Sequence, residues 1–303
     1  MMLESDLEHL ACPDCTGEPL SGCGLRTERG RVLEGGLGCA RCGATFPVEA
    51  GIPVLMPAAL VGARRFGIEG FPEEWRSWGE RLDAFRAWRE RTWSGGGEEE
   101  RERSGALARR RRDEFARFCG WTRGRALDVG CGDGGLFRSG HLGAAEYWGV
   151  DPVPIDGADY DFRFAAALGE RLPFRGGTFE AVMVKESLHH FQDPGRFLDE
   201  ARRVTARGGT LLICQGVEVA APVPAAPGGR AKVLARRAAT AMRLLMKGEL
   251  AELRRRAVGT PGGDEAPWLW RLTREDIEFE VGRRYAIEEA RLDDNCLYLR
   301  GRA

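Results

Sequence analysis

Short apolar runs that end at glycine, polar or acidic residues recur through the second half of the chain. Such runs are typical of strands that are buried in a sheet. Four segments have this character, namely 126–129, 147–150, 179–184 and 210–214. Two further segments, 285–292 and 296–302, flank Asp293-Asp294 and predict a hairpin. The pattern therefore indicates an open, largely parallel sheet that closes with an antiparallel pair.

Two helices are predicted within the sheet region. After Asp193-Pro194, apolar residues at helical spacing indicate a helix that runs to Val204, and Gly208-Gly209 predicts its carboxyl-terminal stop. Thr273 is the expected cap of a second helix over 274–281. Acidic residues in its first turn suit the positive end of the helix dipole.

Helical segments also precede and interrupt the sheet. Aromatic residues recur every three or four positions over 66–93, which favours a helix packed on a core over a substrate-stacking surface. A second helix is expected over 101–118, and its basic run 109–112 could touch phosphates, although such a run is usually a solvated face. Nine basic and two acidic residues over 230–256 accompany an apolar stripe. This basic amphipathic helix could cover a pocket, bind RNA phosphates or lie on an acidic surface.

A glycine-rich turn follows the strand at 126–129. In an open parallel sheet such a turn lies at the carboxyl edge of the strands, where ligands bind. The next strand ends at Asp151, and an interval of about twenty residues is typical of a carboxylate that binds a ribose diol. Asp128 and Asp133 flank the turn, which favours a cationic or zwitterionic ligand over a dinucleotide. Each acidic residue could instead cap a helix or form a turn.

Four motifs in order over 125–215 resemble class I S-adenosylmethionine-dependent methyltransferases: LDVGCGDG, GVD, ERLPFRGGTFEAVMVKESLHHFQDP and FLDEARRVTARGGTLLI. The resemblance implies an α/β, Rossmann-like sheet of seven strands, of which the last is antiparallel. It implies that Asp128 orients the methionine part of S-adenosylmethionine and that Asp151 binds its ribose. The residues implied around the cofactor are Asp128, Gly130, Cys131, Gly132, Asp151, Pro152, Glu170, Arg171 and Lys185.

Two positions depart from the family pattern. Leu168 stands where relatives often carry an aspartate for the adenine, so the backbone of Glu170 and Arg171 would have to serve. Between Asp151 and Phe162 the prolines and glycines disfavour the helix that relatives usually carry. The cofactor site is therefore expected to be open on that flank.

The strand end at 185–191 faces the transferred methyl group in this family. Displacement at a sulfonium methyl depends mainly on positioning of the nucleophile. An oxygen or nitrogen acceptor must also lose a proton, and histidine suits this at neutral pH. His189 and His190 are therefore candidate bases, although both could simply cap or pack a helix. The Asn/Asp-Pro-Pro-aromatic segment of many nucleobase and glutamine methyltransferases does not follow this strand.

The amino-terminal region carries two C-x2-C knuckles. The pairs Cys12/Cys15 and Cys39/Cys42 are separated by 23 residues with a predicted hairpin at 25–38 between them. Four such thiolates can surround one Zn²⁺, and the lack of a preceding strand–helix pattern disfavours redox chemistry. Cys23 is a spare thiol. LACPDC, CARCGATFPV and GIPVLMP resemble the small zinc-ribbon activator of tRNA and release-factor methyltransferases, in which the ribbon is structural.

Composition and length set the broad class. The chain has 303 residues, a net charge of -1 and nine cysteines. Without an apolar signal core or a run of eighteen apolar residues, we expect a cytoplasmic protein with no membrane span. We predict a zinc-ribbon domain over 1–58, a helical linker or lid over 59–119 and a methyltransferase domain over 120–303. A helical insertion is expected at about 218–270, where class I enzymes commonly place substrate-recognising helices.

The function predicted from these features is methyl transfer to an oxygen, nitrogen or carbon nucleophile of a small molecule, as in secondary metabolism. The zinc ribbon would stabilise the enzyme or line the substrate side, or it would fold without contacting substrate. Because zinc ribbons also accompany ribosomal-RNA guanine methyltransferases, an rRNA or tRNA base is the alternative acceptor, although the neutral charge disfavours it. A non-catalytic, cofactor-binding partner protein is the third hypothesis. The acceptor and the oligomeric state are not predicted.

Overall fold

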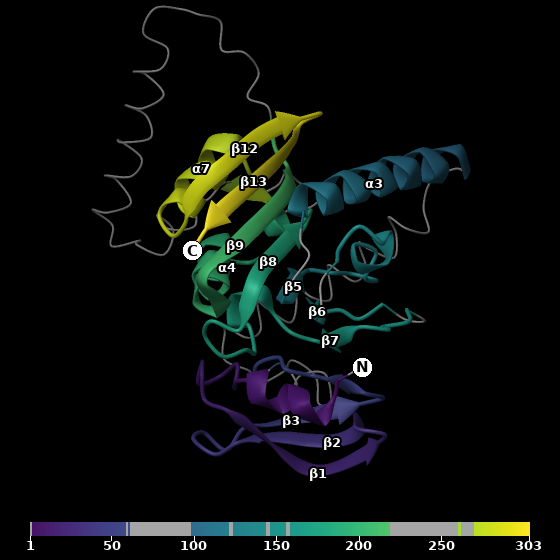
Figure 1. Ribbon diagram of the computed structural model, residues 1–303, viewed down its shortest axis with the longest axis vertical. Coiled ribbons are helices and arrows are strands. Elements are labelled where there is room, and N and C mark those ends of the chain that lie inside the picture. Colours follow the sequence, from purple (N-terminus) through teal and green to yellow (C-terminus); the bar gives the residue numbers. More distant parts are fainter. Residues whose placement is uncertain are drawn as a thin grey trace, which may run out of the picture.

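The computed structural model describes residues 2–58, 60, 98–120, 124–143, 146–155, 158–218, 260–261 and 270–303. The aromatic segment 66–93 and the basic segment 230–256 lie outside these residues. Figure 1 shows two sheets, a small amino-terminal one and a larger one that carries helices on its faces. None of the helices in the described ranges combines the length and the apolar character that crossing a bilayer requires.

The amino-terminal module, residues 2–58, is a four-stranded antiparallel sheet. The 3-10 helix η1 (Glu4–His9) precedes strands β1 (Leu20–Glu28), β2 (Arg31–Cys39), β3 (Thr45–Glu49) and β4 (Ile52–Pro53). The strands pair in that order. The hairpin expected between the cysteine knuckles is confirmed as β1 and β2, and it extends beyond both predicted ends.

The larger sheet has seven strands in the order β12-β13-β9-β8-β5-β6-β7. Its members are β5 (Arg125–Val129), β6 (Glu146–Val150), β7 (Arg163–Ala165), β8 (Phe179–Lys185), β9 (Thr205–Gly216), β12 (Ala286–Asp293) and β13 (Cys296–Arg302). Only β13 runs antiparallel to its neighbours β9 and β12. The predicted seven-stranded sheet with one antiparallel strand is thereby confirmed. Asp294 and Asn295, both with positive φ, form the tip of the closing hairpin.

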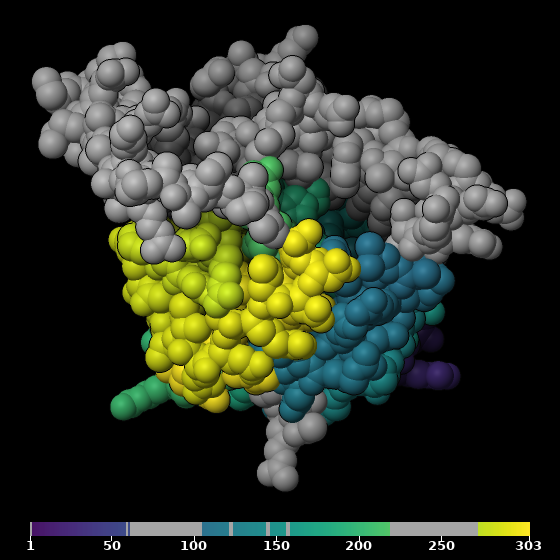
Figure 2. Space-filling model, turned by 90° about the horizontal axis from the view of Figure 1, so that it is seen from above, coloured from purple at the N-terminus to yellow at the C-terminus, as the bar shows by residue number. Residues whose placement is uncertain are grey.

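Helices cover both faces of this sheet. They are α3 (Glu98–Cys119), α4 (Pro194–Val204) and α7 (Arg274–Gly282), with the short 3-10 helices η2 (Phe137–Ser139), η3 (Gly169–Arg171) and η4 (Leu188–His190). The two-residue strands β10 (Thr260–Pro261) and β11 (Trp270–Arg271) form a separate ladder. Figure 2 shows α3 beside the carboxyl-terminal segment, where Glu114 on α3 accepts a hydrogen bond from Tyr298 on β13.

Both helices begin where predicted, and each has a side-chain cap. The Asp193 carboxylate accepts from Arg196 N at the start of α4, and Thr273 forms a capping box with Asp276 at the start of α7. The predicted stop of α4 at Gly208-Gly209 is wrong. The helix ends at Val204 and β9 begins at Thr205, so these glycines lie within a strand. Two β-branched residues in succession, Val204 and Thr205, favour the change to extended backbone.

The amino-terminal module extends the edge of the larger sheet. Val54 forms a parallel bridge with Ala166, directly after β7. Leu55 N donates to Ala166 O over 2.8 Å and Ala166 N donates to Pro53 O over 3.0 Å. Asp6, which is 2% exposed, also pairs with Arg163 of β7 at 2.8 Å. One core cluster accordingly includes buried residues of both the module and the sheet.

Candidate functional site

The glycine turn after β5 packs its backbone against the neighbouring strand ends. Gly130 N donates to Val150 O over 2.8 Å, which ties the turn to the end of β6. A Cβ at Gly130, where φ is 74°, would lie 2.4 Å from Ser187 Oγ. Ser187 Oγ itself donates to Gly130 O over 3.1 Å. The turn thus requires glycine there, and it links β5, β6 and the segment after β8.

Asp151 braces this turn from the end of β6. Its Oδ2 accepts from Gly132 N over 3.2 Å and its Oδ1 accepts from Val153 N over 2.9 Å. The residue is 7% exposed. Pro152 follows it, half-buried, and no helix lies in the described residues between Asp151 and Phe162. The expected irregular crossover is therefore present on this flank.

Asp128 is a buried acidic group beside the turn. It is 2% exposed, and Tyr147 on β6 donates its hydroxyl proton to Oδ2. The other carboxylate oxygen, Oδ1, is buried and has no partner among the described residues. Burial raises the pKa of Asp128 to about 7, although the Tyr147 hydrogen bond and the charge of Lys185 oppose this. A hydrogen-bond donor or a cationic group on a ligand could pair with Oδ1 and offset the cost of its burial.

Three of the expected cofactor residues use their side chains for contacts within the protein. Cys131 buries its thiol in the core cluster between the sheet and α3, so only its backbone is left for a ligand. Glu170 Oε1 accepts from Gln192 N over 2.7 Å, just before α4. Arg171 Nη1 donates to Pro13 O over 3.4 Å, which connects η3 to the first cysteine knuckle.

The two candidate histidines lie in η4, directly after β8, with ring centroids 4.1 Å apart. His189 Nδ1 is hydrogen-bonded to Gln215 Nε2 on β9. Burial lowers the pKa of His189, and the Glu186 carboxylate only partly opposes this. Through Ser187 this turn also contacts Gly130, so the histidines and the glycine turn share one edge of the sheet.

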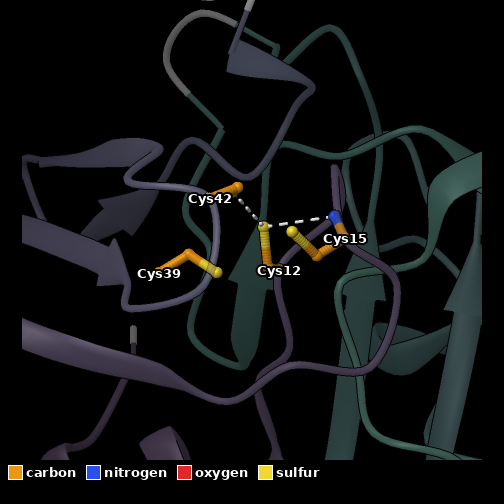
Figure 3. A group of neighbouring side chains, drawn as sticks. All are labelled: Cys12, Cys15, Cys39 and Cys42. Carbon is orange, nitrogen blue, oxygen red and sulfur yellow. Dashed lines mark hydrogen bonds between the residues drawn. The ribbon is translucent and has the colours of Figure 1, made fainter.

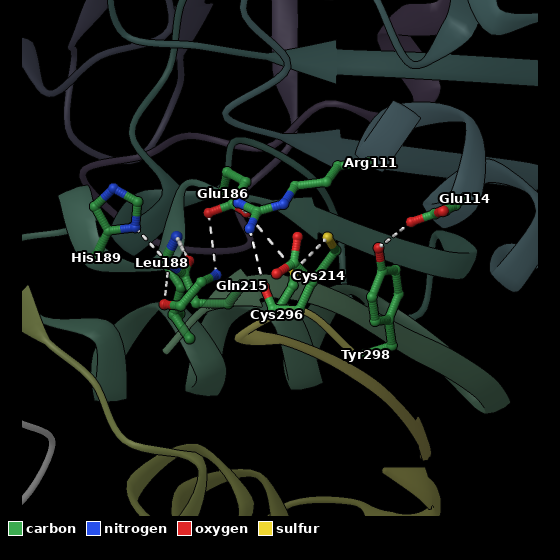
Figure 4. Close-up of polar contacts among 11 residues, drawn as sticks. Arg111, Glu114, Glu186, Leu188, His189, Cys214, Gln215, Cys296 and Tyr298 are labelled. Carbon is green, nitrogen blue, oxygen red and sulfur yellow. Dashed lines mark hydrogen bonds and ion pairs between the residues drawn. The ribbon is translucent and has the colours of Figure 1, made fainter. Parts of the chain in front are cut away.

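Sequence reasoning missed a polar cluster on the other side of Gln215, drawn in Figure 4. Glu186, with φ of 50°, lies between Arg111 of α3 and two thiols. Arg111 Nη1 is 3.4 Å from Glu186 Oε1, so this arginine does not lie on a solvated face as expected. The sulfurs of Cys214 and Cys296 are 3.2 Å apart. Thiolates about 2.3 Å from one Zn²⁺ lie nearly 3.8 Å apart, so this spacing fits a packed thiol pair better.

The four knuckle cysteines converge, as Figure 3 shows. Their sulfur atoms all lie within 4.8 Å of one another. Cys12 Sγ and Cys42 Sγ are 3.8 Å apart, which matches the edge of a tetrahedron with metal–sulfur distances of about 2.3 Å. Cys15 N donates to Cys12 Sγ over 3.5 Å, as expected within a knuckle. Cys23 is exposed and stands apart from this group. The donor set suits a thiophilic ion such as Zn²⁺.

Comparisons with known proteins identify the central segment. Residues 127–213 match the model of the family described as "Methyltransferase domain". An uncharacterized methyltransferase of Mycobacterium sp. strain KMS is 33% identical over 92 residues, which cover 29% of this chain and 36% of the relative. The demethylmenaquinone methyltransferase of Streptomyces griseus is 42% identical over 52 residues, covering 17% and 23%. The chain thus spans about a third or less of the length of these relatives.

Solved structures also match this chain, at low sequence identity. The magnesium protoporphyrin IX methyltransferase of Synechocystis is 14% identical, covers 73% of this chain and 94% of its own, and gives a TM-score of 0.44. A methyltransferase complex of Haloferax volcanii with the Trm112 activator gives 18% identity, coverage of 67% and 94%, and a TM-score of 0.38. The family match is thus limited to residues 127–213, and the strand order of the sheet is established by the chain's own strand pairing.

Proposed function

We propose that this chain transfers the methyl group of S-adenosylmethionine to a small-molecule acceptor. The observation that carries the proposal is the buried carboxylate of Asp128 beside the glycine turn, whose Oδ1 has no partner among the described residues. A buried, unpaired carboxylate oxygen is costly, and a ligand cation would relieve that cost. The family match over 127–213 makes the amino group of S-adenosylmethionine the cation to test.

The residues at this edge suit that ligand. Asp128 would bind the amino group, and the backbone of Gly130, Cys131 and Gly132 would follow the methionine part. Asp151 holds the turn through Gly132 N, and its carboxylate at the end of β6 is the group proposed to accept hydrogen bonds from the ribose hydroxyls. When bound, the cofactor supplies an electrophilic methyl group on sulfur. The chain's own contribution is then to bind and align the acceptor at the edge that carries Lys185, His189 and His190.

The small-molecule acceptor is inferred from charge and from the named relative. A net charge of -1 offers no overall attraction to nucleic acid. The Streptomyces relative is named for demethylmenaquinone, a small molecule. We also propose that one Zn²⁺ occupies the Cys12/Cys15/Cys39/Cys42 cluster in a structural role. Its four sulfur donors leave no open position for substrate.

Calorimetry tests the cofactor site directly. Purified, zinc-loaded protein should bind S-adenosylmethionine and S-adenosylhomocysteine at one site per chain. Asp151→Ala should weaken the binding of both compounds by about 100-fold. The variant removes the carboxylate and with it two charge-assisted hydrogen bonds, which hold the turn and the bound ligand. Equal affinities in the variant and the wild type would reject the site. RNA binding that falls steeply with salt would instead favour a nucleic-acid acceptor.

A further inference from the structure

Gln215 is a buried polar side chain that directly follows the apolar run 211–214 near the end of β9. It is 1% exposed, and β9 lies between β8 and the closing hairpin. Its Oε1 accepts from Leu188 N over 3.1 Å, and its Nε2 donates to Gly216 O over 3.1 Å. A backbone N–H can only donate and a backbone carbonyl can only accept. Both contacts therefore fix the same orientation of the amide, because turning it over would lose both hydrogen bonds.

This orientation decides the role of His189. Gln215 Nε2 is also hydrogen-bonded to His189 Nδ1, as Figure 4 shows, and the second hydrogen of the amide is available for this contact. Nδ1 must then accept, and a neutral imidazole that accepts at Nδ1 carries its proton on Nε2. Protonating Nδ1 would set two hydrogen-bond donors against each other. Burial of the ring also disfavours the cation. No described residue is hydrogen-bonded to Nε2, which lies on the far side of the ring from Gln215.

We propose that Gln215 holds His189 as the neutral Nε2–H tautomer, so that His189 donates a hydrogen bond to an oxygen of the methyl acceptor and does not take the acceptor's proton. This rests on the proposed methyl transfer at the same sheet edge. The lone pair on His189 Nδ1 accepts the hydrogen bond from Gln215, so it cannot take a proton from the methyl acceptor. The acceptor must therefore react without deprotonation by His189. The geometry therefore points to acceptors with an acidic oxygen group, such as a carboxylic acid or an acidic phenol or enol, already ionised at neutral pH.

Gln215 acts only through His189, so it is a positioning residue, and the tautomer is its signature. Nitrogen NMR distinguishes a protonated ring nitrogen from an unprotonated one without any methyl acceptor. The chain has four histidines, and His189→Asn identifies the signals of His189 by their loss. Between pH 6 and 8, His189 should show an unprotonated Nδ1 and a protonated Nε2. A protonated Nδ1 at pH 7 would overturn the proposal.

Gln215→Glu reverses the hydrogen bond with an isosteric side chain. A carboxylate in place of the amide can still accept from Leu188 N, but it presents an acceptor to His189 Nδ1. The variant should shift His189 to the Nδ1–H tautomer or to the cation. Gln192→Glu is the matched control, because it adds the same charge near η4 without a hydrogen bond to His189. Unchanged signals in Gln215→Glu, or the same shift in Gln192→Glu, would show that Gln215 does not set the tautomer.

The acceptor class is tested with two ring compounds of opposite charge. In the presence of S-adenosylhomocysteine, benzoate should shift the His189 Nε2–H signal of the wild type, and benzylamine should not. A response to benzylamine alone, or no response to benzoate at millimolar concentrations, would reject the acidic-oxygen class. If S-adenosylhomocysteine does not bind by calorimetry, the proposed function fails, whereas the tautomer of His189 remains measurable on the protein alone.

Discussion

Replacing Asp128 with asparagine tests how costly the buried carboxylate is. Burial raises the pKa of Asp128 to about 7, whereas an aspartate in an unfolded chain titrates near 3.9. The folded state thus binds a proton more tightly than the unfolded state. The contribution of this proton to the free energy of unfolding is fully present below about pH 4. It is lost as the pH rises through about 7. Asparagine keeps an oxygen that can accept from Tyr147 but cannot ionise, so the variant should escape this loss.

The size of the effect follows from the two pKa values. A difference of about three units corresponds to about 4 kcal/mol between pH 4 and 8. Between pH 5.5 and 8, where thiolate–zinc sites persist, the wild type should lose about 2 kcal/mol relative to Asp128→Asn. For 303 residues the entropy of unfolding is about 0.6 kcal/mol/K, so the melting temperatures should diverge by about 3 °C.

Thermal unfolding followed by circular dichroism at several pH values measures this divergence in cofactor-free protein. The diagnostic quantity is how the difference in melting temperature between the wild type and Asp128→Asn changes with pH. The difference at a single pH is not diagnostic, because the buried asparagine amide has a desolvation cost of its own at every pH. Asp133→Asn, which removes the same charge from an exposed side chain of the same turn, should follow the wild type. Parallel curves for the wild type and Asp128→Asn would refute the reasoning, since they would mean that Asp128 is not a buried, high-pKa acid.

Three further outcomes follow from the geometry. Gly134→Ala should destabilise the fold by about 2–3 kcal/mol in urea titrations. A Cβ at this position would lie 2.2 Å from the Phe162 ring, and the backbone φ of 81° is unfavourable for alanine. A loss below about 0.5 kcal/mol would mean that the glycine turn is not packed against this ring. Cys39→Ser should lose its zinc in elemental analysis whereas Cys23→Ser retains one zinc per chain, and equal zinc contents would exclude the four-cysteine site. Asp6→Ala should cost about 3 kcal/mol in the same titrations, because it leaves the partner arginine on β7 unpaired at a largely buried position, and a neutral result would show that this ion pair is solvated.

The sheet could be predicted because its signals are local. Short apolar runs and the polar pair Asp293-Asp294 predict strands and a hairpin without knowledge of their neighbours, and the tip lies one residue later, at Asp294 and Asn295. The stop of α4 was misplaced for a related reason. Gly208-Gly209 is a strong local signal, yet β9 begins earlier and the strand continues through these glycines to pair with β8 and β13. Pairing between strands distant in sequence decided the boundary there.

The site was only partly accessible from sequence. Asp128 and Asp151 could be proposed from the sequence because both accompany strand signals at a characteristic interval. Gln215 could not, since its proposed role depends on backbone groups of η4 that come beside it only in the folded sheet. One signal was available, namely a polar residue directly after the apolar run 211–214. Arg111 was assigned to a solvated face because a run of arginines does not show which member turns inward.

Val54 and Leu55 continue the sheet beyond β7, and this has a consequence for aggregation of the protein. A chelator that removes the proposed Zn²⁺ from the knuckle cysteines should unfold the small module, since metal-binding modules of this size depend on their metal. The backbone groups of Ala166 would then lose both of their partners, and a bare strand edge would face water. Such an edge recruits other chains. Loss of one ion would therefore be seen as turbidity and self-association, well before the larger sheet itself melts.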